Sequence, residues 1–273
     1  MKTVKFTKIT GSGNDFLLMH RVGIAGTSLT QLARRICDRK FGIGADGLLL
    51  LEKSKKADIR MRIINADGSE ASMCGNGARC VALYARRQAK SQKGRIFIET
   101  KAGIIESRVI GDNVKIKLTE PRNLKLDIPI KVSKRTLRVN FINTGVPHAV
   151  IFVQGLSDID VLNLGRQIRY HRSFRPAGAN VNFVEVQDKR FIKARTYERG
   201  VEDETLACGT GAVASAIIFV AKSPDVKSSR YVINVKTHSA EVLKVYFDKI
   251  EGRFRNAWLE GKVRITGQGV YYV

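Results

Sequence analysis

The sequence predicts an α+β protein of two similar domains related by a pseudo-twofold axis. Each domain is expected to be a curled, mostly antiparallel sheet around a central helix, with the active site in the cleft between them. Three observations lead to this fold class: many short β-rich runs joined by Gly, Asn and Asp turns, one helix that is apolar on nearly every face, and a motif that occurs twice. The chain of 273 residues is long enough for two such domains.

Helices are predicted where apolar residues recur at intervals of three and four positions. The four segments with this spacing are Leu29–Cys37, Ala78–Ala89, Val161–Tyr170 and Gly211–Ala221. The last segment is apolar almost all round, and such a helix is normally enclosed rather than laid on a surface. We therefore expect a sheet to wrap around it.

Strands are predicted where β-rich runs alternate with turn residues. One meander comprises Arg95–Thr100, Ile104–Ile110 and Val114–Leu118, and a second comprises Tyr231–Lys236, Glu241–Phe247 and Arg253–Trp258. The mixed polar segment Thr119–Asp127, which contains Pro121, is the predicted domain junction. The expected domains are residues 1–118, completed by a C-terminal strand at 264–273, and residues 119–263.

The charge balance is strongly basic, with 48 Lys and Arg against 25 Asp and Glu, a net charge of +23. These cations are scattered rather than gathered into a stripe or a recognition helix, which disfavours nucleic-acid binding and favours a solvated basic surface. The N-terminus lacks the apolar run of a secretory signal, and no segment approaches the roughly 18 apolar residues that span a bilayer. We expect a cytoplasmic protein that does not bind membranes.

Metal and cofactor signatures are not found in the sequence. The four cysteines, Cys37, Cys74, Cys80 and Cys208, form no CxxC pair, which argues against zinc and against a disulfide framework, and the histidines are isolated. Residues 11–16 (GSGNDF) begin like a dinucleotide loop but end in Phe16 and lead into a strand-like run. No lysine stands in a recognisable pyridoxal phosphate context. The sequence therefore predicts chemistry without a metal or cofactor.

The most informative pattern is a motif that appears twice. Residues 70–78 read EASMCGNGA and residues 204–212 read ETLACGTGA, and both copies lead into a predicted helix. A single Cys-Gly-x-Gly is often only a buried thiol at a tight turn. Two copies with the same flanks instead predict a duplicated domain with one functional thiol in each half, Cys74 and Cys208. Cys37 and Cys80 lack this setting and are expected to be packing residues.

A thiol at the first turn of a helix has a specific chemistry. The unpaired N–H groups there are expected to lower the pKa of the thiol and to bind a carboxylate. Two thiols on opposite faces of one carbon could remove a proton and return one to the other face, which is racemase or epimerase chemistry without a cofactor. A single thiol with His148 as its base is the alternative, but it leaves the second cysteine unexplained.

The chain closely resembles the diaminopimelate epimerase family over nearly its whole length. The resemblance is carried by Gly13–Phe16, Phe41–Gly47, Asn65–Glu70, Met73–Cys80, Pro147–His148, Glu198–Gly200 and Ala207–Ala212. It implies the interconversion of LL- and meso-2,6-diaminopimelate in lysine and peptidoglycan precursor biosynthesis. It also implies a homodimer, no cofactor, and two α+β domains that close over the substrate.

The resemblance also assigns roles to individual residues. Cys74 and Cys208 match the acid/base pair, and His148 and Glu198 match the residues that assist the thiols. The positions that match substrate-binding residues are Asn14, Asn65, Gly75, Asn76, Asn180, Glu198, Arg199, Gly209 and Thr210. Without the resemblance, the asparagines would also fit simple turn formers, and Glu198 and Arg199 would fit a surface ion pair. His148 would fit a ring exposed in a loop.

Three departures from the family pattern stand out. Val146 and Gly47 replace an asparagine and a glutamine that contact the substrate in other members, and the segment Glu198–Thr205 is one residue longer than usual. Two other functions stay open from the sequence. One is a related two-thiol racemase acting on another amino acid such as proline or glutamate. The other is a basic binding protein on the same scaffold that has lost catalysis.

Overall fold

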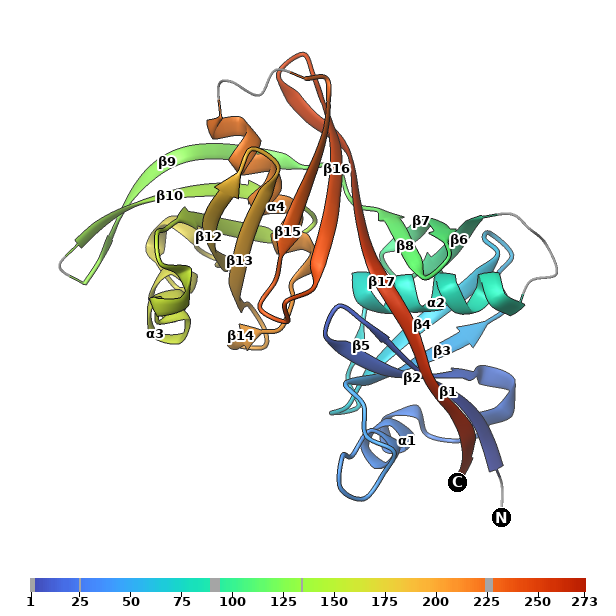
Figure 1. Ribbon diagram of the computed structural model, residues 1–273. Helices are drawn as coiled ribbons and strands as arrows, with labels where there is room; N and C mark the ends of the chain where they lie inside the picture. Colours follow the sequence, from blue (N-terminus) through green and yellow to red (C-terminus); the bar gives the residue numbers. More distant parts are fainter. Residues whose placement is uncertain (1–2, 25, 89–93, 134, 224–227) are drawn as a thin grey trace. The chain divides into compact units, whose positions relative to one another are not determined.

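The computed structural model describes residues 3–24, 26–88, 94–133, 135–223 and 228–273 of the chain. It divides into two compact units (Figure 1), each rich in strands with few helices, so the predicted α+β class is confirmed. Unit 1 comprises Met1–Ile116 and Gly261–Val273, and unit 2 comprises Lys117–Glu260. These boundaries lie within a few residues of the expected 118/119 and 263/264.

The described residues of unit 1 form two α-helices, one 3-10 helix and a set of strands. The last strand of the chain joins this sheet by pairing with the first. Its helices are α1 (Leu29–Ile36) and α2 (Gly75–Gln88), with η1 at Arg21–Ile24. Its strands are β1 (Thr3–Gly11), β2 (Asn14–His20), β3 (Gly47–Glu52), β4 (Ile59–Asn65), β5 (Glu70–Ala71), β6 (Arg95–Thr100), β7 (Gly103–Ile110) and β8 (Asn113–Lys117).

Unit 2 has the same kinds of element. Its helices are α3 (Val161–Arg169) and α4 (Gly209–Lys222), with η2 at Leu156–Asp158 and η3 at Arg172–Phe174. Its strands are β9 (Arg122–Val132), β10 (Arg135–Asn143), β11 (Pro147–Phe152), β12 (Asn180–Asp188), β13 (Phe191–Glu198), β14 (Asp203–Thr205), β15 (Arg230–Lys236), β16 (Val242–Ile250) and β17 (Arg253–Tyr272), which also serves unit 1.

The strand pairings repeat from one unit to the other. In unit 1, β2–β3 and β4–β6 are parallel, and β1–β2, β3–β4 and β6–β7 are antiparallel. In unit 2, β11–β12 and β13–β15 are parallel, and β10–β11, β12–β13 and β15–β16 are antiparallel. A parallel pair needs a crossover, and a helix lies in each one: α1, α2, α3 and α4 in chain order. The repeated motif is thus one part of a repeated topology.

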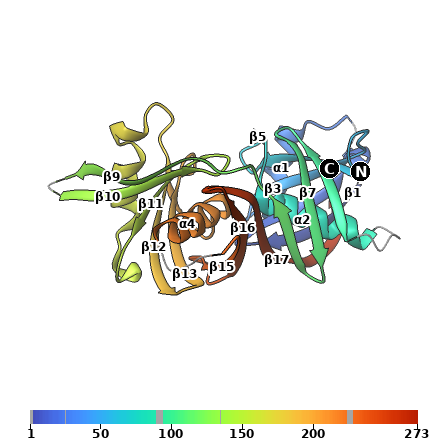
Figure 2. The ribbon, with the colours of Figure 1, turned by 90° about the horizontal axis from the view of Figure 1, so that it is seen from above.

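The central helix of unit 2 is enclosed as its composition predicts. Residues 211–220 of α4 are all buried, and α4 contacts β10, β11, β12, β13, β15 and β16. Figure 2 shows α4 nearly end-on with these strands around it. Helix α2 is buried over its first half and contacts β1, β2, β4, β6 and β7. Each sheet therefore holds the first turn of its helix in a fixed place.

Two sequence predictions about extended segments were wrong in detail. The expected strands Arg253–Trp258 and 264–273 are not separate but form one continuous strand, β17, whose last part pairs with β1 (red beside blue in Figure 1). Most of the predicted junction Thr119–Asp127 lies in β9, because residues from Arg122 onward pair with β10. The predicted helix Ala78–Ala89 begins earlier, at Gly75, and its last residue lies outside the described residues.

Candidate functional site

Both cysteines of the repeated motif stand directly before a helix. Cys74 precedes the first residue of α2, and Cys208 is the N-cap of α4 in an extended conformation. The amide of Gly77 donates to Cys74 Sγ at 3.4 Å. The backbone amides of Thr210 and Gly211 lie close enough to the Cys208 sulfur to favour its thiolate, although the sulfur makes no N-cap hydrogen bond. The two thiols therefore occupy the same local frame, each beside the unpaired N–H groups of a helix start.

The second glycine of each motif allows a strand side chain to reach the helix. A Cβ at Gly211 would lie 2.3 Å from Asn182 Oδ1 and 3.2 Å from Cys208 Sγ. A Cβ at Gly77 would lie 3.0 Å from Leu49 Cδ2. A neighbouring strand therefore packs directly on both first turns, and the contact leaves least room at Gly211, where Asn182 would have to move to admit a Cβ.

The glutamate that opens each motif forms a two-point ion pair with an arginine on the adjacent strand. Arg62 Nε and Nη2 donate to Glu70 at 2.8 and 3.0 Å. Arg195 Nε and Nη2 donate to Glu204 at 2.7 and 2.7 Å. These pairs fasten the short strands β5 and β14 and so fix the loops that carry the thiols. The sequence repeat marked the glutamates but carried no signal for their partners.

In unit 1 the structure joins two of the predicted asparagines. Asn76 Nδ2 donates to Asn14 Oδ1 at 2.7 Å, and Asn14 Nδ2 donates to Asp46 Oδ2 at 2.9 Å. Arg79 donates to Asn76 Oδ1 at 2.7 Å, so both ends of the Asn76 side-chain amide are hydrogen-bonded. Asn65 is exposed at the end of β4, where its side-chain amide donates to the Ser69 hydroxyl of its own turn rather than to Asn14 or Asn76.

In unit 2 the predicted residues at the strand ends contact one another. Asn180 Oδ1 accepts the backbone N–H of Arg199 at 2.7 Å, which fixes the turn after β13. Glu198 accepts a hydrogen bond from the Thr205 hydroxyl at 2.9 Å, and burial raises the pKa of the Glu198 carboxyl. The predicted Glu198, Arg199 and Asn180 thus form one cluster.

His148 is buried within this unit and is bonded on both ring nitrogens. Its Nε2 lies 3.0 Å from Thr210 Oγ1, and its Nδ1 lies 3.1 Å from Asn182 Nδ2. Burial, with a smaller contribution from the charge of Arg199, lowers the pKa of His148 to about 3. The ring is therefore neutral at ordinary pH. Thr210 Oγ1 also lies 3.6 Å from Cys208 Sγ, so His148 is linked to the thiol through one hydroxyl.

The expected lowering of the thiol pKa does not hold for Cys208. Burial, followed by the nearby negative charge of Glu198, raises the pKa of Cys208 to about 12. The hydrogen bonds from Thr210 and Gly211 lower that pKa, but by less than burial raises it. Cys37 also has its pKa raised by burial, to about 11, and it packs in an apolar cluster as expected for a structural thiol. The prediction was wrong because it considered the effect of the helix terminus on the thiol pKa but not the effect of removing the thiol from water.

Two of the three departures from the family pattern have local explanations. Val146 accepts the Thr144 N–H at 3.2 Å through its backbone carbonyl, and nothing in the structure explains its side chain. A Cβ at Gly47 would lie 2.9 Å from the Ile64 carbonyl oxygen on β4. The longer segment makes a turn closed by Glu202, which accepts the Gly200 N–H at 3.0 Å. This turn ends before β14, so the extra residue is accommodated upstream of Cys208.

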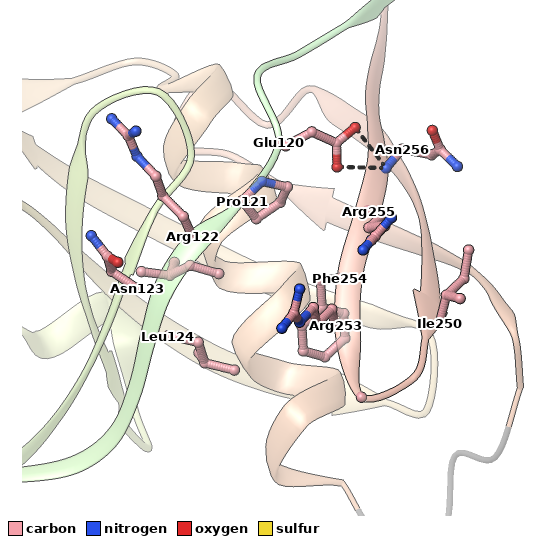
Figure 3. Close-up of a pocket in the computed structure, with 12 residues that line it drawn as sticks. Glu120, Pro121, Arg122, Asn123, Leu124, Ile250, Arg253, Phe254, Arg255 and Asn256 are labelled. Atoms are coloured by element: carbon pink, nitrogen blue, oxygen red, sulfur yellow. Dashed lines mark hydrogen bonds between the residues drawn. The ribbon is translucent and has the colours of Figure 1, made fainter.

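A cavity of about 760 Å³ in unit 2 lies apart from the predicted residues (Figure 3). It lies between the start of β9 and the β16–β17 turn, and Arg122, Arg253 and Arg255 are among its lining residues. Glu120 accepts the Asn256 backbone N–H at 3.1 and 3.2 Å beside it. None of the predicted site residues lines this cavity, and no sequence pattern pointed to it.

No group of three or more His, Cys, Asp or Glu among the described residues could hold a metal ion. Among the same residues, no helix is long and apolar enough to cross a membrane.

Comparison with known proteins gives one consistent result. The family model described as diaminopimelate epimerase matches residues 6–124 and 140–248. The diaminopimelate epimerase of Aquifex aeolicus is 40% identical and covers 97% of each chain. That of Caldanaerobacter subterraneus is 42% identical over 79% of this chain and 83% of its own.

Solved structures match the fold at low identity. A phenazine biosynthesis protein of the PhzF family from Bacillus anthracis has a TM-score of 0.76 at 18% identity, over 100% of both chains. A hydroxyproline epimerase from Agrobacterium vitis, solved with trans-4-hydroxy-L-proline, has a TM-score of 0.70 at 16% identity, over 99% of this chain and 91% of that one. These likenesses establish the fold.

Proposed function

The chain belongs to the diaminopimelate epimerase family, and we propose that it interconverts LL- and meso-2,6-diaminopimelate by moving the α-proton between two thiols, Cys74 and Cys208. The observation that carries this proposal is the duplicated placement of a cysteine before the first turn of a central helix. That duplication supplies one proton carrier for each face of a substrate carbon.

The reaction balances without any other reactant. One sulfur, as thiolate, takes the α-proton, and the electron pair of the broken C–H bond spreads onto the α-carboxylate. The other sulfur, as thiol, gives its proton to the opposite face and becomes the thiolate. The N–H groups of Gly75, Asn76, Gly209 and Thr210, which face away from the helix without a carbonyl partner in it, are suited to hold the carboxylate oxygens while charge develops on them.

The surroundings of Cys208 suggest which thiol holds the proton at rest. Because burial raises the pKa of Cys208 to about 12, it is protonated before substrate arrives and serves as the donor first. Cys74 is only partly buried and would then be the acceptor. In the reverse reaction the two thiols exchange roles.

The remaining predicted residues are suited to hold the rest of the substrate. Diaminopimelate carries two carboxylates and two ammonium groups. The guanidinium of Arg199 complements the distal carboxylate, and the Glu198 carboxyl complements an ammonium group. Asn14, Asn65, Asn76 and Asn180 offer both donors and acceptors.

The decisive experiment is a coupled assay with a dehydrogenase specific for the meso isomer. Wild-type protein should produce meso-diaminopimelate from the LL isomer, and Cys74→Ala and Cys208→Ala should each abolish turnover. Cys37→Ala is the matched control, because this buried cysteine lies outside the motif. Turnover by either motif variant would exclude the two-thiol mechanism.

Two further outcomes separate the alternatives. If reduced, folded wild-type protein does not turn over diaminopimelate, a panel of single enantiomers of other amino acids followed by polarimetry tests for a related racemase. The mechanism also requires both sulfurs to reach one carbon, so mild oxidation should join Cys74 to Cys208 and stop turnover. Activity that survives formation of that bond would contradict the mechanism.

We further propose that the enzyme needs no cofactor and works as a homodimer in the cytoplasm. Full activity after exhaustive dialysis against EDTA would support the first statement. Light scattering at micromolar concentration measures the oligomeric state, and cell fractionation measures the location.

A further inference from the structure

Asn182 is a fully buried polar residue to which the sequence assigned no role. It lies on β12, and its side-chain Nδ2 is 3.0 Å from the carbonyl oxygen of Ala149 and 3.1 Å from His148 Nδ1. Its Oδ1 accepts the hydroxyl of Thr196 at 2.9 Å. A backbone carbonyl can only accept, so the contact with Ala149 fixes which end of the amide faces His148. Asn182 therefore donates to Nδ1.

This contact determines the proton positions in the rest of the chain of bonds. A neutral imidazole that accepts at Nδ1 carries its proton on Nε2. Nε2–H then donates to Thr210 Oγ1, 3.0 Å away. The hydroxyl proton of Thr210 is left to point at Cys208 Sγ, 3.6 Å away. Every donor in the series is directed toward the sulfur.

The groups around this row of hydrogen-bonded side chains, Asn182, His148, Thr210 and Cys208, oppose the binding of a second proton to His148. The positive charge of Arg199 acts in the same direction as burial, and Asn182 would face an Nδ1–H donor to donor. Glu198 is the charged group that acts on Cys208. His148 is therefore unsuited to act as a cation and suited to act as a fixed neutral donor.

The internal repeat provides independent support. Strand registers place His148, Asn182 and Thr196 where unit 1 has three apolar residues. In unit 1, Phe16 pairs with Gly47 and Leu49 pairs with Ile63; in unit 2, His148 pairs with Asn180 and Asn182 pairs with Thr196. All six side chains at these three positions are buried. The corresponding apolar residues are Phe16, Leu49 and Ile63.

Leu49 and Asn182 also occupy matching positions beside the central helices α2 and α4. Leu49 packs on Gly77 just as Asn182 packs on Gly211. The fold thus accepts an apolar residue at this place, and a buried amide is not needed to build the sheet. A buried polar group that the architecture does not require points to a role in the chemistry.

We propose that Asn182 is a positioning residue that holds His148 as its Nε2-protonated tautomer and so directs the Thr210 hydroxyl to stabilise the Cys208 thiolate. This inference rests on the proposed function, because a thiolate at Cys208 is needed only if that thiol carries the proton. Asn182 acts on the sulfur through His148 and Thr210.

The first test is nitrogen-15 NMR of the histidine rings in the ligand-free protein. The His148 signals, identified by their loss in His148→Gln, should show a neutral ring with the proton on Nε2 at pH 7. In Asn182→Asp, a carboxylate facing Nδ1 should move the proton to Nδ1. A wild-type ring protonated on Nδ1, or on both nitrogens, would overturn the inference.

The second test uses Asn182→Leu, which installs the residue that unit 1 has at this place. It should remain folded but with a lower Tm, because His148 Nδ1 and the Thr196 hydroxyl lose a buried partner. The value of kcat should fall by about ten- to hundredfold, the cost of one hydrogen bond to a charged group. KM should change little, and the pH at which kcat rises should move upward. Thr196→Val is the matched control: it leaves both Nδ2 bonds intact, so the tautomer should be retained and the loss should be smaller.

The outcomes separate this inference from the proposed function. Wild-type protein that turns over no diaminopimelate but shows the expected tautomer would contradict the proposed function alone. Active wild-type protein together with an equally active, folded Asn182→Leu variant would contradict the positioning role. If Asn182→Leu does not fold, the Asn182→Asp variant decides, since a switched tautomer with unchanged kcat overturns the inference.

Discussion

Replacing Glu70 by glutamine should destabilise the protein by an amount that depends on pH. The pKa of Glu70 falls from 4.5 to about 2, chiefly because Arg62 hydrogen-bonds to it, with a further contribution from Lys101. Each tenfold change in proton affinity corresponds to about 1.4 kcal/mol. Allowing for screening at a partly exposed site, ionised Glu70 contributes about 2–3 kcal/mol to the free energy of unfolding.

The pH dependence has a definite sign. A carboxyl whose pKa is lowered by folding stabilises the native state fully above pH 4.5, and this contribution is lost as the pH falls from 4.5 toward 2. Urea unfolding followed by circular dichroism should therefore show a large difference between wild type and Glu70→Gln at pH 7. The difference should be smaller at pH 3.

A matched control lies in the same unit. Glu106 pairs with Arg95 and Arg108, whose side chains are 57% and 49% exposed, so Glu106→Gln should cost less than about 1 kcal/mol. If Glu70→Gln costs no more than this control, or if its cost is the same at pH 7 and pH 3, then the ion pair does not hold β5 as we have argued.

Three further predictions concern the thiols and the central helix of unit 2. Gly211→Ala should abolish most activity and lower the Tm, because its Cβ would lie 2.3 Å from a side-chain oxygen, whereas Gly267→Ala, with nothing within 4 Å, should change neither measurement. Ile217→Ala removes a fully buried side chain from α4 and should lower the free energy of unfolding by about 2–5 kcal/mol in urea titrations. Iodoacetamide at pH 8 should alkylate Cys74 before Cys208 by peptide mass analysis, since burial raises the pKa of Cys208 to about 12 and the thiolate is the reactive form; alkylation of Cys208 first would contradict this.

The sequence predicted the fold well where local patterns determine it. Helical spacing located all four α-helices found among the described residues, and the apolar composition of α4 predicted its enclosure. The pairing partners were not predictable in the same way, because β2–β3 and β13–β15 join residues far apart in the chain. The sequence divided β17 into two strands, Arg253–Trp258 and 264–273, because Gly261 and the charged residues on either side of it are poor strand formers.

The same distinction between local patterns and strand pairing applies to the candidate site. The repeat located both thiols and the helix starts beside them, because backbone geometry is encoded locally by glycine. The ion pairs of Glu70 and Glu204 and the buried Asn182 depend on register between strands, which one sequence does not reveal. The pKa of Cys208 depends on burial by the whole sheet, so a local argument from the helix terminus gave the wrong direction.

The repeated topology also explains why two thiols in the same frame can do different work. Two residues after each cysteine, unit 1 has Asn76, bonded to Asn14, and unit 2 has Thr210, bonded to His148. An amide pair offers fixed hydrogen bonds to a ligand, whereas a hydroxyl backed by a buried imidazole can direct a proton at a sulfur. The backbone thus provides two equivalent helix starts suited to bind a carboxylate, and a few side chains at matching places give their thiols different surroundings. That inequality suits an enzyme in which one thiol must hold a proton while the other has lost it.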